Sequence, residues 1–408
     1  MKLLIYEHVS GGGCADEAIP SSVLSEGFGM LKTLISDFKA AGHSVTTTLD
    51  ARIAKLNPPI NADCAVPVFS SREAQANIQK ISEKADAAYI ISPETDGLLQ
   101  SLVEIVDQTG VASLNCSAGA IEKVSNKAVF YDFVKKMGLR VPETMTFSVA
   151  DDLEEIKRAV RGSFPLIFKP ANGVSCCGLS LVRNEDHVAG AVCKIKKDTS
   201  SNQFVVQELI AGAAASVSLV STGGEALAIS LNQQDVTIGT PESFSGYSGG
   251  VVPFDHPLRA EAFEAAEKIV KSFRDLRGYV GVDFVLTEDE AVAIEVNPRL
   301  TTSYVGLRSV ASFNLAQAIV NAVLKHKLPT HIQSSGYACF SKVVTPNPPM
   351  EILQRAYEMD EVVSPPFPVS ETSAASALIA AHGATSREAS SRFREAKKRV
   401  LNIISRGK

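Results

Sequence analysis

The sequence lacks the patterns that mark several large classes of protein. Its seven cysteines are odd in number, irregularly spaced and without a Cys-x-x-Cys pair, which indicates neither a disulfide framework nor a zinc site. No segment approaches the roughly 20 uninterrupted apolar residues that a membrane helix needs. A formal net charge of −5 gives no reason to expect a nucleic-acid or membrane surface. Tryptophan is also absent, which excludes nothing.

What remains is the composition of an ordinary globular protein. Hydrophobic residues make up 45% of the 408 and charged residues 21%. This length predicts about two to three domains. The segment 1–7 reaches an acidic residue too early for the apolar region of a signal peptide. We therefore expect a cytoplasmic protein with reduced thiols.

Strand and helix patterns alternate over residues 1–115. The apolar spacing of 24–41 is helical and stops at Gly42. Further strands are predicted at 3–6, 44–49 and 87–91, and further helices at 78–85 and 98–109. Such alternation predicts an α/β domain with a parallel sheet covered by helices on both faces.

From residue 118 the pattern changes to helices mixed with hairpins. The region 118–137 is helical with an interruption at 125–127. The stretch 232–255 contains the run Gly-Tyr-Ser-Gly-Gly, and we expect it to be a mobile substrate loop rather than a packed element. A final segment, 336–408, contains strands, a proline-rich turn and a basic helix.

The stretch 281–300 carries polar side chains that a strand core would not choose. Asp283 lies in its first strand, and Glu295 and Asn297 alternate with apolar residues in its second. If a hairpin turn joins the strands, these side chains and Arg299 share one face. Two carboxylates and a carboxamide are hard oxygen ligands, which Mg²⁺ prefers when it also holds phosphate. The alternative is an exposed polar face on a two-stranded ribbon.

A lysine and a loop of small residues form a second candidate site. Lys169 ends an apolar strand, and the loop 171–178 follows it directly. Short side chains let backbone N–H groups approach an anion, and a strand-end lysine pairs with phosphate. The alternative is a plain β-turn beside a snorkelling lysine. We interpret Cys176 and Cys177 as small loop fillers, because no histidine lies nearby in the sequence.

A third candidate is the polar end of the strand around residue 206. Gln207, Glu208 and Leu209 follow three apolar residues and precede Gly212. Such a strand end is typical of an interdomain hinge whose backbone groups bond a purine edge. An ordinary strand end is the alternative.

The order of these motifs is more specific than any one of them. Along the chain come Ser125-Asn126-Lys127, Phe168-Lys169-Pro170, the small loop, Val206-Gln207-Glu208-Leu209, Gly281-Val282-Asp283 and Ile294-Glu295-Val296-Asn297-Pro298-Arg299. That order resembles the ATP-grasp superfamily, whose members hold ATP between two α+β lobes. The resemblance implies an ATP-grasp fold with an N-terminal α/β domain over 1–115. It further implies a small lobe over 116–206, a large lobe over 207–330 and a C-terminal segment over 331–408 that packs on the large lobe.

The resemblance also implies roles for individual residues, with ATP and Mg²⁺ (or Mn²⁺) as cofactors. Its metal ligands would be Asp283, Glu295 and Asn297, and its catalytic residues Arg299 and Lys169. Its nucleotide contacts would be Lys127, Lys169, the loop residues Gly173, Ser175 and Gly178, and the hinge residues Gln207, Glu208 and Leu209. Many members grip the ribose with an acid just past the hinge. The residues here are Ala213-Ala214-Ala215-Ser216, so the ribose contact stays unassigned.

The segments 6–13, 25–31 and 297–304 resemble the tyramine–L-glutamate ligase family of methanofuran biosynthesis. This implies a ligase that joins a carboxylate to an amine through an acyl phosphate, with small-molecule amino acid and amine partners. A homodimer is left open.

The candidate substrate contacts are Glu7, Gly12 and Arg308. A capping role for Glu7, a surface loop around Gly12 and a solvated Arg308 are the alternatives. Two other functions stay open at this point. One is a bicarbonate-using enzyme similar to carbamoyl-phosphate synthase or a carboxylase, and the other is a nucleotide-binding regulatory module without turnover.

Overall fold

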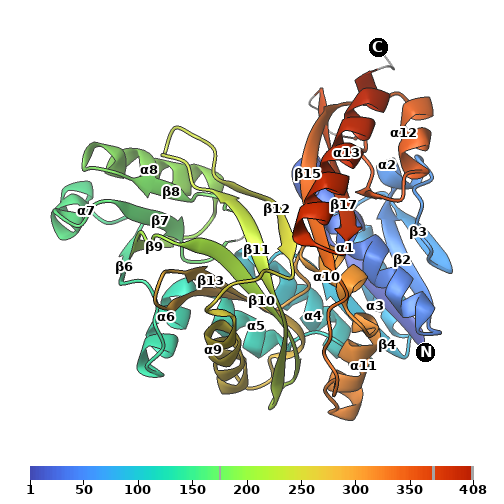
Figure 1. Cartoon of the computed structure of the whole chain (residues 1–408), viewed down its shortest axis with the longest axis horizontal. Coiled ribbons are helices and arrows are strands. Elements are labelled where there is room, and N and C mark those ends of the chain that lie inside the picture. The colour runs from blue at the N-terminus through green and yellow to red at the C-terminus, as the bar shows by residue number, and fades with distance from the viewer. Residues whose placement is uncertain (174–175, 370–372, 406–408) are drawn as a thin grey trace.

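The computed structural model describes residues 1–173, 176–369 and 373–405, which form three β-sheets with helices packed around them (Figure 1). The N-terminal sheet and the C-terminal segment lie at one end of the molecule. The sheet built from residues 144–208 lies at the other end. An eight-stranded sheet runs between them.

The N-terminal sheet is parallel, with strand order β3-β2-β1-β4-β5. Its strands are β1 Lys2–Glu7, β2 Ser44–Asp50, β3 Cys64–Val68, β4 Ala87–Ile91 and β5 Ala112–Ser113, and its helices are α1 Ser21–Ala40, α2 Ala51–Ala54, α3 Ser71–Ser82 and α4 Leu98–Gln108. The expected α/β domain is confirmed. Strand β3 was not predicted, because Pro67 interrupts the strand pattern of this edge strand.

The four-stranded sheet has the order β6-β9-β7-β8. Its strands are β6 Thr144–Ser148, β7 Leu166–Pro170, β8 Ser180–Val182 and β9 Gln203–Glu208, with helices α7 Leu153–Val160 and α8 Asp186–Asp198. Phe168 and Phe204 are fully buried and share a core with Ile156 and Val188 from the two helices. This packing fixes the ends of β7 and β9, which carry Lys169 and Gln207.

The eight-stranded sheet is antiparallel, with the order β14-β13-β10-β11-β12-β15-β17-β16. Its first five strands in chain order are β10 Ala213–Thr222, β11 Ala226–Thr237, β12 Gly246–Val252, β13 Arg277–Leu286 and β14 Ala291–Asn297. The helices of this part are α5 Ala118–Ser125, α6 Lys127–Lys136, α9 Arg259–Ser272, α10 Tyr304–Val310 and α11 Leu315–Lys325.

The expectation of a loop over 232–255 is wrong for most of this stretch, and only 238–245 connect two strands. Strand β11 continues to Thr237, and β12 pairs with β11 on one side and β15 on the other. The glycines that suggested a loop permit close approach of the neighbouring strands. A Cβ atom at Gly249 would lie 2.0 Å from the Phe340 carbonyl oxygen, and one at Gly250 would lie 1.9 Å from the Gln233 carbonyl oxygen.

The C-terminal segment continues the same sheet. It consists of β15 Tyr337–Pro346, α12 Met350–Tyr357, β16 Val362–Ser364, β17 Ala374–Gly383 and α13 Ser386–Ser405. It also packs on α1 of the N-terminal domain, where the rings of Phe28 and Phe367 lie 4.8 Å apart. Helix α1 and strand β15 are therefore neighbours although they come from opposite ends of the chain.

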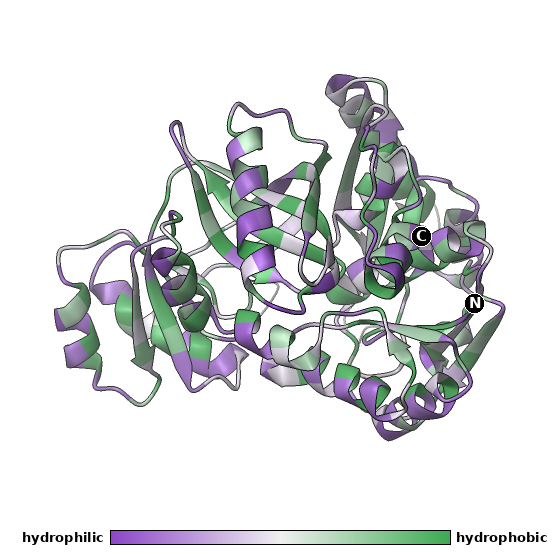
Figure 2. Cartoon of the chain, turned by 90° about the horizontal axis from the view of Figure 1, so that it is seen from below, coloured by the Kyte–Doolittle hydropathy of each residue, from purple (hydrophilic) through white to green (hydrophobic). Residues whose placement is uncertain are grey.

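Helices around the sheets alternate hydrophilic and hydrophobic residues along their length (Figure 2). In α9, for example, Ala262, Ala266 and Ile269 are fully buried. This is the pattern of amphipathic helices that cover a sheet with one face. Within the described ranges, no helix is both long and apolar enough to cross a membrane.

Candidate functional site

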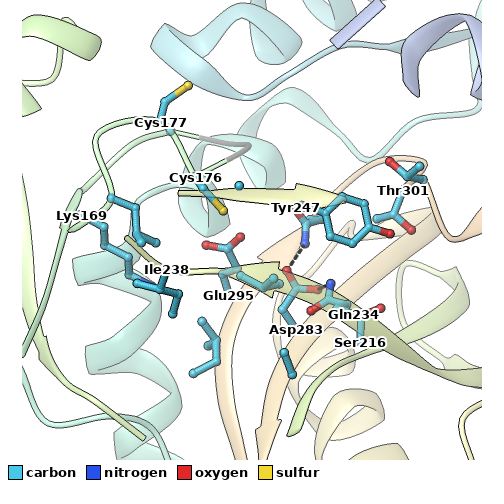
Figure 3. A pocket seen from close by; sticks show the side chains of 18 of the residues that line it. Lys169, Cys176, Cys177, Ser216, Gln234, Ile238, Tyr247, Asp283, Glu295 and Thr301 are labelled. Atoms are coloured by element: carbon cyan, nitrogen blue, oxygen red, sulfur yellow. Dashed lines mark hydrogen bonds between the residues drawn. The ribbon is translucent and has the colours of Figure 1, made fainter. Parts of the chain in front are cut away.

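A cavity of about 710 Å³ lies between the four-stranded sheet, the eight-stranded sheet and the N-terminal domain. Residues from all three sheets contribute to its wall, including β7, β13, β14, β15 and residues of α1. Its size is that of a typical small-molecule site. Figure 3 shows Asp283 and Glu295 beside each other on neighbouring strands of this wall.

A β-hairpin places the two carboxylates. Strands β13 and β14 pair antiparallel with Asp283 directly opposite Glu295, and the Thr287 N–H donates to the Glu290 carbonyl at 3.0 Å to close the turn. Asn297 joins them, since its Nδ2 donates to Asp283 Oδ2 at 3.1 Å. The structure therefore brings together the three residues that the strand pattern assigned to one face.

The two carboxylates differ in their electrostatic surroundings. Burial raises the pKa of Asp283 to about 7, and the charge of Glu295 adds to the rise. Burial acts the same way on Glu295, but Lys127 and then Lys169 outweigh it and lower the pKa of that carboxyl. Near pH 7, Glu295 is therefore ionised while Asp283 is partly protonated. A bound cation would favour the ionised form of both.

The donor set of this hairpin fits a hard divalent cation. Two carboxylates and an amide are the oxygen donors that Mg²⁺ takes while its remaining positions hold water or phosphate. A half-turn of the Asn297 amide would present its oxygen, which now faces Arg299, towards Asp283. Among the described residues, no group of three or more His, Cys, Asp or Glu is arranged to hold a metal. Exogenous oxygens would therefore have to complete the shell.

Two lysines lie on the side of the four-stranded sheet. Lys169 is 5% exposed at the end of β7, and burial lowers its pKa to about 8 although Glu295 opposes the drop. Lys127 begins α6, which Asn126 caps. The Lys127 ammonium donates to the Gly173 carbonyl at 2.7 Å and lies 3.3 Å from Glu295 Oε2. Both lysines are thus buried, where their attraction to an anion is stronger than in water.

The small-residue loop borders the cavity only in part. Gly173, Cys176 and Cys177 line it, and Figure 3 shows the Cys176 sulfur pointing towards Glu295. Burial raises the pKa of Cys176 to about 12, which agrees with its interpretation as a filler rather than a nucleophile. Gly178 lies next to the lining residues, packed near Pro170, and Ser175 falls outside the described residues.

The polar strand end of β9 borders an apolar part of the cavity. Leu209 and Ile210 line it together with Ile167, Ile238 and Ile294. Apolar walls beside a strand end suit a purine ring.

The side chains of the two polar hinge residues are already engaged. Gln207 donates to Thr144 Oγ1 at 2.8 Å. Glu208 accepts from Arg140 and from the Glu143 N–H, both at 3.0 Å. The side chains of Gln207 and Glu208 are thus engaged within the protein, and only backbone groups of this strand end are left for a ligand.

Arg299 is held by a residue that the sequence did not single out. Its Nε donates to Glu94 Oε2 at 2.8 Å, in an ion pair whose side chains are 15% and 6% exposed. Burial alone would lower the pKa of Arg299, but the negative charge of Glu94 outweighs burial and raises that pKa. Glu94 Oε1 has no partner among the described residues. An acid just after a buried strand of a parallel sheet is the pattern that would have revealed Glu94.

Of the three candidate substrate contacts, only Glu7 reaches the cavity wall. Its carboxylate accepts from Val9 N–H at 3.0 Å and from Ser10 N–H at 2.7 Å, so it also caps the loop. Gly12 packs on Val68 away from the cavity. Arg308 pairs with Asp37 and does not line the cavity.

The chain is similar to known proteins over most of its length. The family model for the pre ATP-grasp 3 domain matches residues 43–121, and the one for the ATP-grasp domain matches 124–303. The tyramine–L-glutamate ligase of Methanocaldococcus fervens is 28% identical over 82% of this chain and 98% of its own length. That of Methanocaldococcus jannaschii is 27% identical over 80% and 92%.

Solved structures share the fold at low sequence identity. A biotin carboxylase from Campylobacter jejuni in complex with an ATP analogue has a TM-score of 0.72 at 16% identity, over 99% of this chain and 95% of its own. An L-amino acid ligase from Bacillus licheniformis has a TM-score of 0.68 at 14% identity, over 97% of both chains. The two domain matches follow one another along the chain and meet at the cavity described above. The chain therefore belongs to the ATP-grasp superfamily.

Proposed function

We propose that the protein is an ATP-dependent ligase that joins a carboxylate to an amine, with glutamate and tyramine or a similar amine as its substrates. The observation that carries this proposal is the cavity itself. It combines a carboxylate pair, the buried Lys127 and Lys169, the partly buried Arg299 and apolar walls with an extension towards the N-terminal domain. The tyramine–L-glutamate ligases that resemble the chain over most of its length supply the substrate class.

The proposed reaction has two steps. An oxygen of the substrate carboxylate bonds to the γ-phosphorus of ATP, and the bond to the bridging oxygen breaks to release ADP. The amine nitrogen then bonds to the acyl carbon of the acyl phosphate. The bond from that carbon to the phosphate oxygen breaks, and the proton of the nitrogen leaves with the phosphate. The products are an amide, ADP and inorganic phosphate.

The chain's own residues would position charge rather than form covalent bonds. Lys127 and Lys169 would contact phosphate oxygens, and burial makes these contacts stronger than in water. Arg299 would face the transferred phosphoryl group and the oxyanion of the second step. Asp283, Glu295 and Asn297 would hold Mg²⁺ or Mn²⁺, which supplies neutralisation of phosphate charge when bound.

A phosphate-release assay tests this proposal. The full chain is incubated with ATP and Mg²⁺ and with single amino acids and amines, starting from glutamate and tyramine. Phosphate release that needs both partners, together with an amide product in the mass spectrum, is the expected result. Release with bicarbonate alone would instead indicate a carboxylase-like enzyme. ATP binding without turnover under any condition would indicate a regulatory module.

A further inference from the structure

A second charged cluster lies on the cavity wall, away from the metal and phosphate residues. Lys342 on β15 lies 2.6 Å from Glu26 Oε1 on α1 and donates to Ser22 Oγ at 3.0 Å. Thr302 donates to the other oxygen of Glu26 at 2.7 Å. All four residues line the cavity. None of the residues assigned so far to metal, nucleotide or phosphate belongs to this cluster.

The cluster has unused bonding capacity. An ammonium has three N–H donors, and the described partners of Lys342 occupy two of them. Each carboxylate oxygen has two acceptor positions, and each oxygen of Glu26 accepts one described bond. The side chains of Glu26 and Lys342 are both 15% exposed, so they are partly desolvated but reachable from the cavity. A ligand can thus join the ion pair without breaking it.

The chemistry of this cluster fits a zwitterion. A neutral pair of opposite charges gains little from a ligand of one sign, because attraction to one partner is offset by repulsion from the other. A ligand that carries an ammonium and a carboxylate on one carbon can match both charges. Charge-assisted hydrogen bonds of this kind are about twice as strong as neutral ones.

The cluster is also close to the reacting groups. Thr302 follows Arg299 by three residues, and three residues span at most about 10 Å. Figure 3 places Tyr247 near Asp283 and Thr301, and Thr301 directly precedes Thr302 of this cluster. The cavity is continuous between the two clusters. A short ligand can therefore reach both.

We propose that Glu26 and Lys342, supported by Ser22 and Thr302, bind the α-ammonium and α-carboxylate of the amino acid substrate. The side-chain carboxylate of that amino acid then faces Arg299 and the metal residues, where it is phosphorylated. This assignment rests on the proposed ligase function and makes the carboxylate substrate an acidic amino acid with a free zwitterionic head. The ion pair sets specificity by its position between α1 and β15.

The test uses the variant Lys342→Met and substrates that each lack one group. Loss of one charge-assisted contact is expected to raise the KM for glutamate about 10- to 100-fold and to change the KM for ATP less than about twofold. The wild type is expected to prefer glutamate to 4-aminobutyrate, which lacks the α-carboxylate. Lys342→Met is expected to lose this preference. Glu26→Gln is expected to lose the preference for glutamate over glutarate, which lacks the α-amino group.

Lys39→Met is the matched control. Lys39 also lies on α1 and pairs with an acid, Asp63. Unlike Lys342, Lys39 does not line the cavity. This control is expected to leave both preferences unchanged. An unchanged KM for glutamate in Lys342→Met, or a raised KM for the amine instead, would overturn the assignment. If the ion pair only ties α1 to β15, Lys342→Met would lower the melting temperature and leave both substrate preferences intact. That result would also contradict the assignment.

Calorimetry separates this inference from the ligase proposal. Glutamate is titrated into the full chain loaded with a non-hydrolysable ATP analogue. Binding in the wild type that is lost in Lys342→Met supports the subsite even if no turnover is found, in which case the ligase proposal alone fails. Turnover together with unaltered glutamate binding in Lys342→Met would contradict the subsite and leave the ligase proposal intact. An absence of both glutamate binding and turnover overturns both.

Discussion

The two charged clusters of the cavity differ in how their charges are balanced. On the β13–β14 hairpin, two carboxylates stand directly opposite each other, and burial together with the charge of Glu295 raises the pKa of Asp283 to about 7. At the Glu26–Lys342 pair, one acid meets one base at 2.6 Å. The first cluster gains from an added cation, because like charges repel until one is neutralised. The second gains from a ligand that is itself neutral overall. Under the proposed assignments, one half of the cavity would hold the metal and phosphates and the other half the amino acid.

The largest expected effect comes from breaking the metal half. Glu295→Gln is expected to lower phosphate release by at least about 10³-fold, because positioning and charge stabilisation supply most of the catalysis in phosphoryl transfer. The measurement is steady-state phosphate release, with circular dichroism to show that the fold is intact. Glu290→Gln is the control, since Glu290 lies in the same hairpin but pairs with Arg140 outside the cavity. Activity retained in Glu295→Gln would contradict the assignment of the metal ligands.

A smaller loss is expected when the orientation of Arg299 is disturbed. Glu94→Gln keeps the shape but removes the charge that pairs with Arg299 at 2.8 Å. We expect kcat to fall about 10- to 100-fold while the KM for ATP changes little, because Arg299 faces the reacting groups rather than the purine. A rise in the KM for ATP at constant kcat would instead place Arg299 among the nucleotide contacts. Full kinetics in ATP and in both substrates distinguish the two outcomes.

The raised pKa of Asp283 predicts pH-dependent metal binding. Below about pH 7 the proton on Asp283 competes with the cation, so Mn²⁺ affinity is expected to rise by up to about tenfold per pH unit and to level off above that pH. Titration calorimetry at pH 6, 7 and 8 measures this dependence. The slope is expected to vanish in Asp283→Asn. An affinity that does not change between pH 6 and 8 in the wild type would contradict the raised pKa.

The same pKa predicts a smaller effect on stability without metal. The folded pKa of Asp283 lies above its unfolded value, so the folded state binds more protons between about pH 4 and 7, and the free energy of unfolding falls as pH rises across that window. Asp283→Asn is therefore expected to raise the melting temperature more at pH 8 than at pH 5. Thermal denaturation in the presence of a chelator measures the difference. An equal change at both pH values would contradict a raised pKa of Asp283 in the folded state.

The difference between the β13–β14 cluster and the Glu26–Lys342 pair also explains how much of the molecule could be predicted from its sequence. Asp283, Glu295 and Asn297 lie on one hairpin, where alternation along a strand determines which side chains share a face. The parallel N-terminal sheet was predictable for a similar reason, because its strands and helices alternate locally. Glu26 and Lys342 are 316 residues apart, and the packing of α1 on β15 and β17 brings them together. No local pattern contains that information.

The failed prediction over 232–255 has the same physical origin. Its glycines are loop formers when judged locally, but in the sheet they let β12 approach β11 and β15. Arg308 was misjudged in a related way, because its partner Asp37 lies in a helix 271 residues earlier. Residues whose environment comes from distant strands were therefore the ones that sequence reasoning missed.

The most direct test of the account follows oxygen from the substrate to the phosphate. Glutamate labelled with ¹⁸O in its side-chain carboxylate is turned over with ATP and the amine, and the inorganic phosphate is examined by mass spectrometry. Attack of that carboxylate on the γ-phosphorus predicts one ¹⁸O atom in each phosphate released. Phosphate without the label, formed at the same rate as the amide, would contradict an acyl phosphate and with it the central claim.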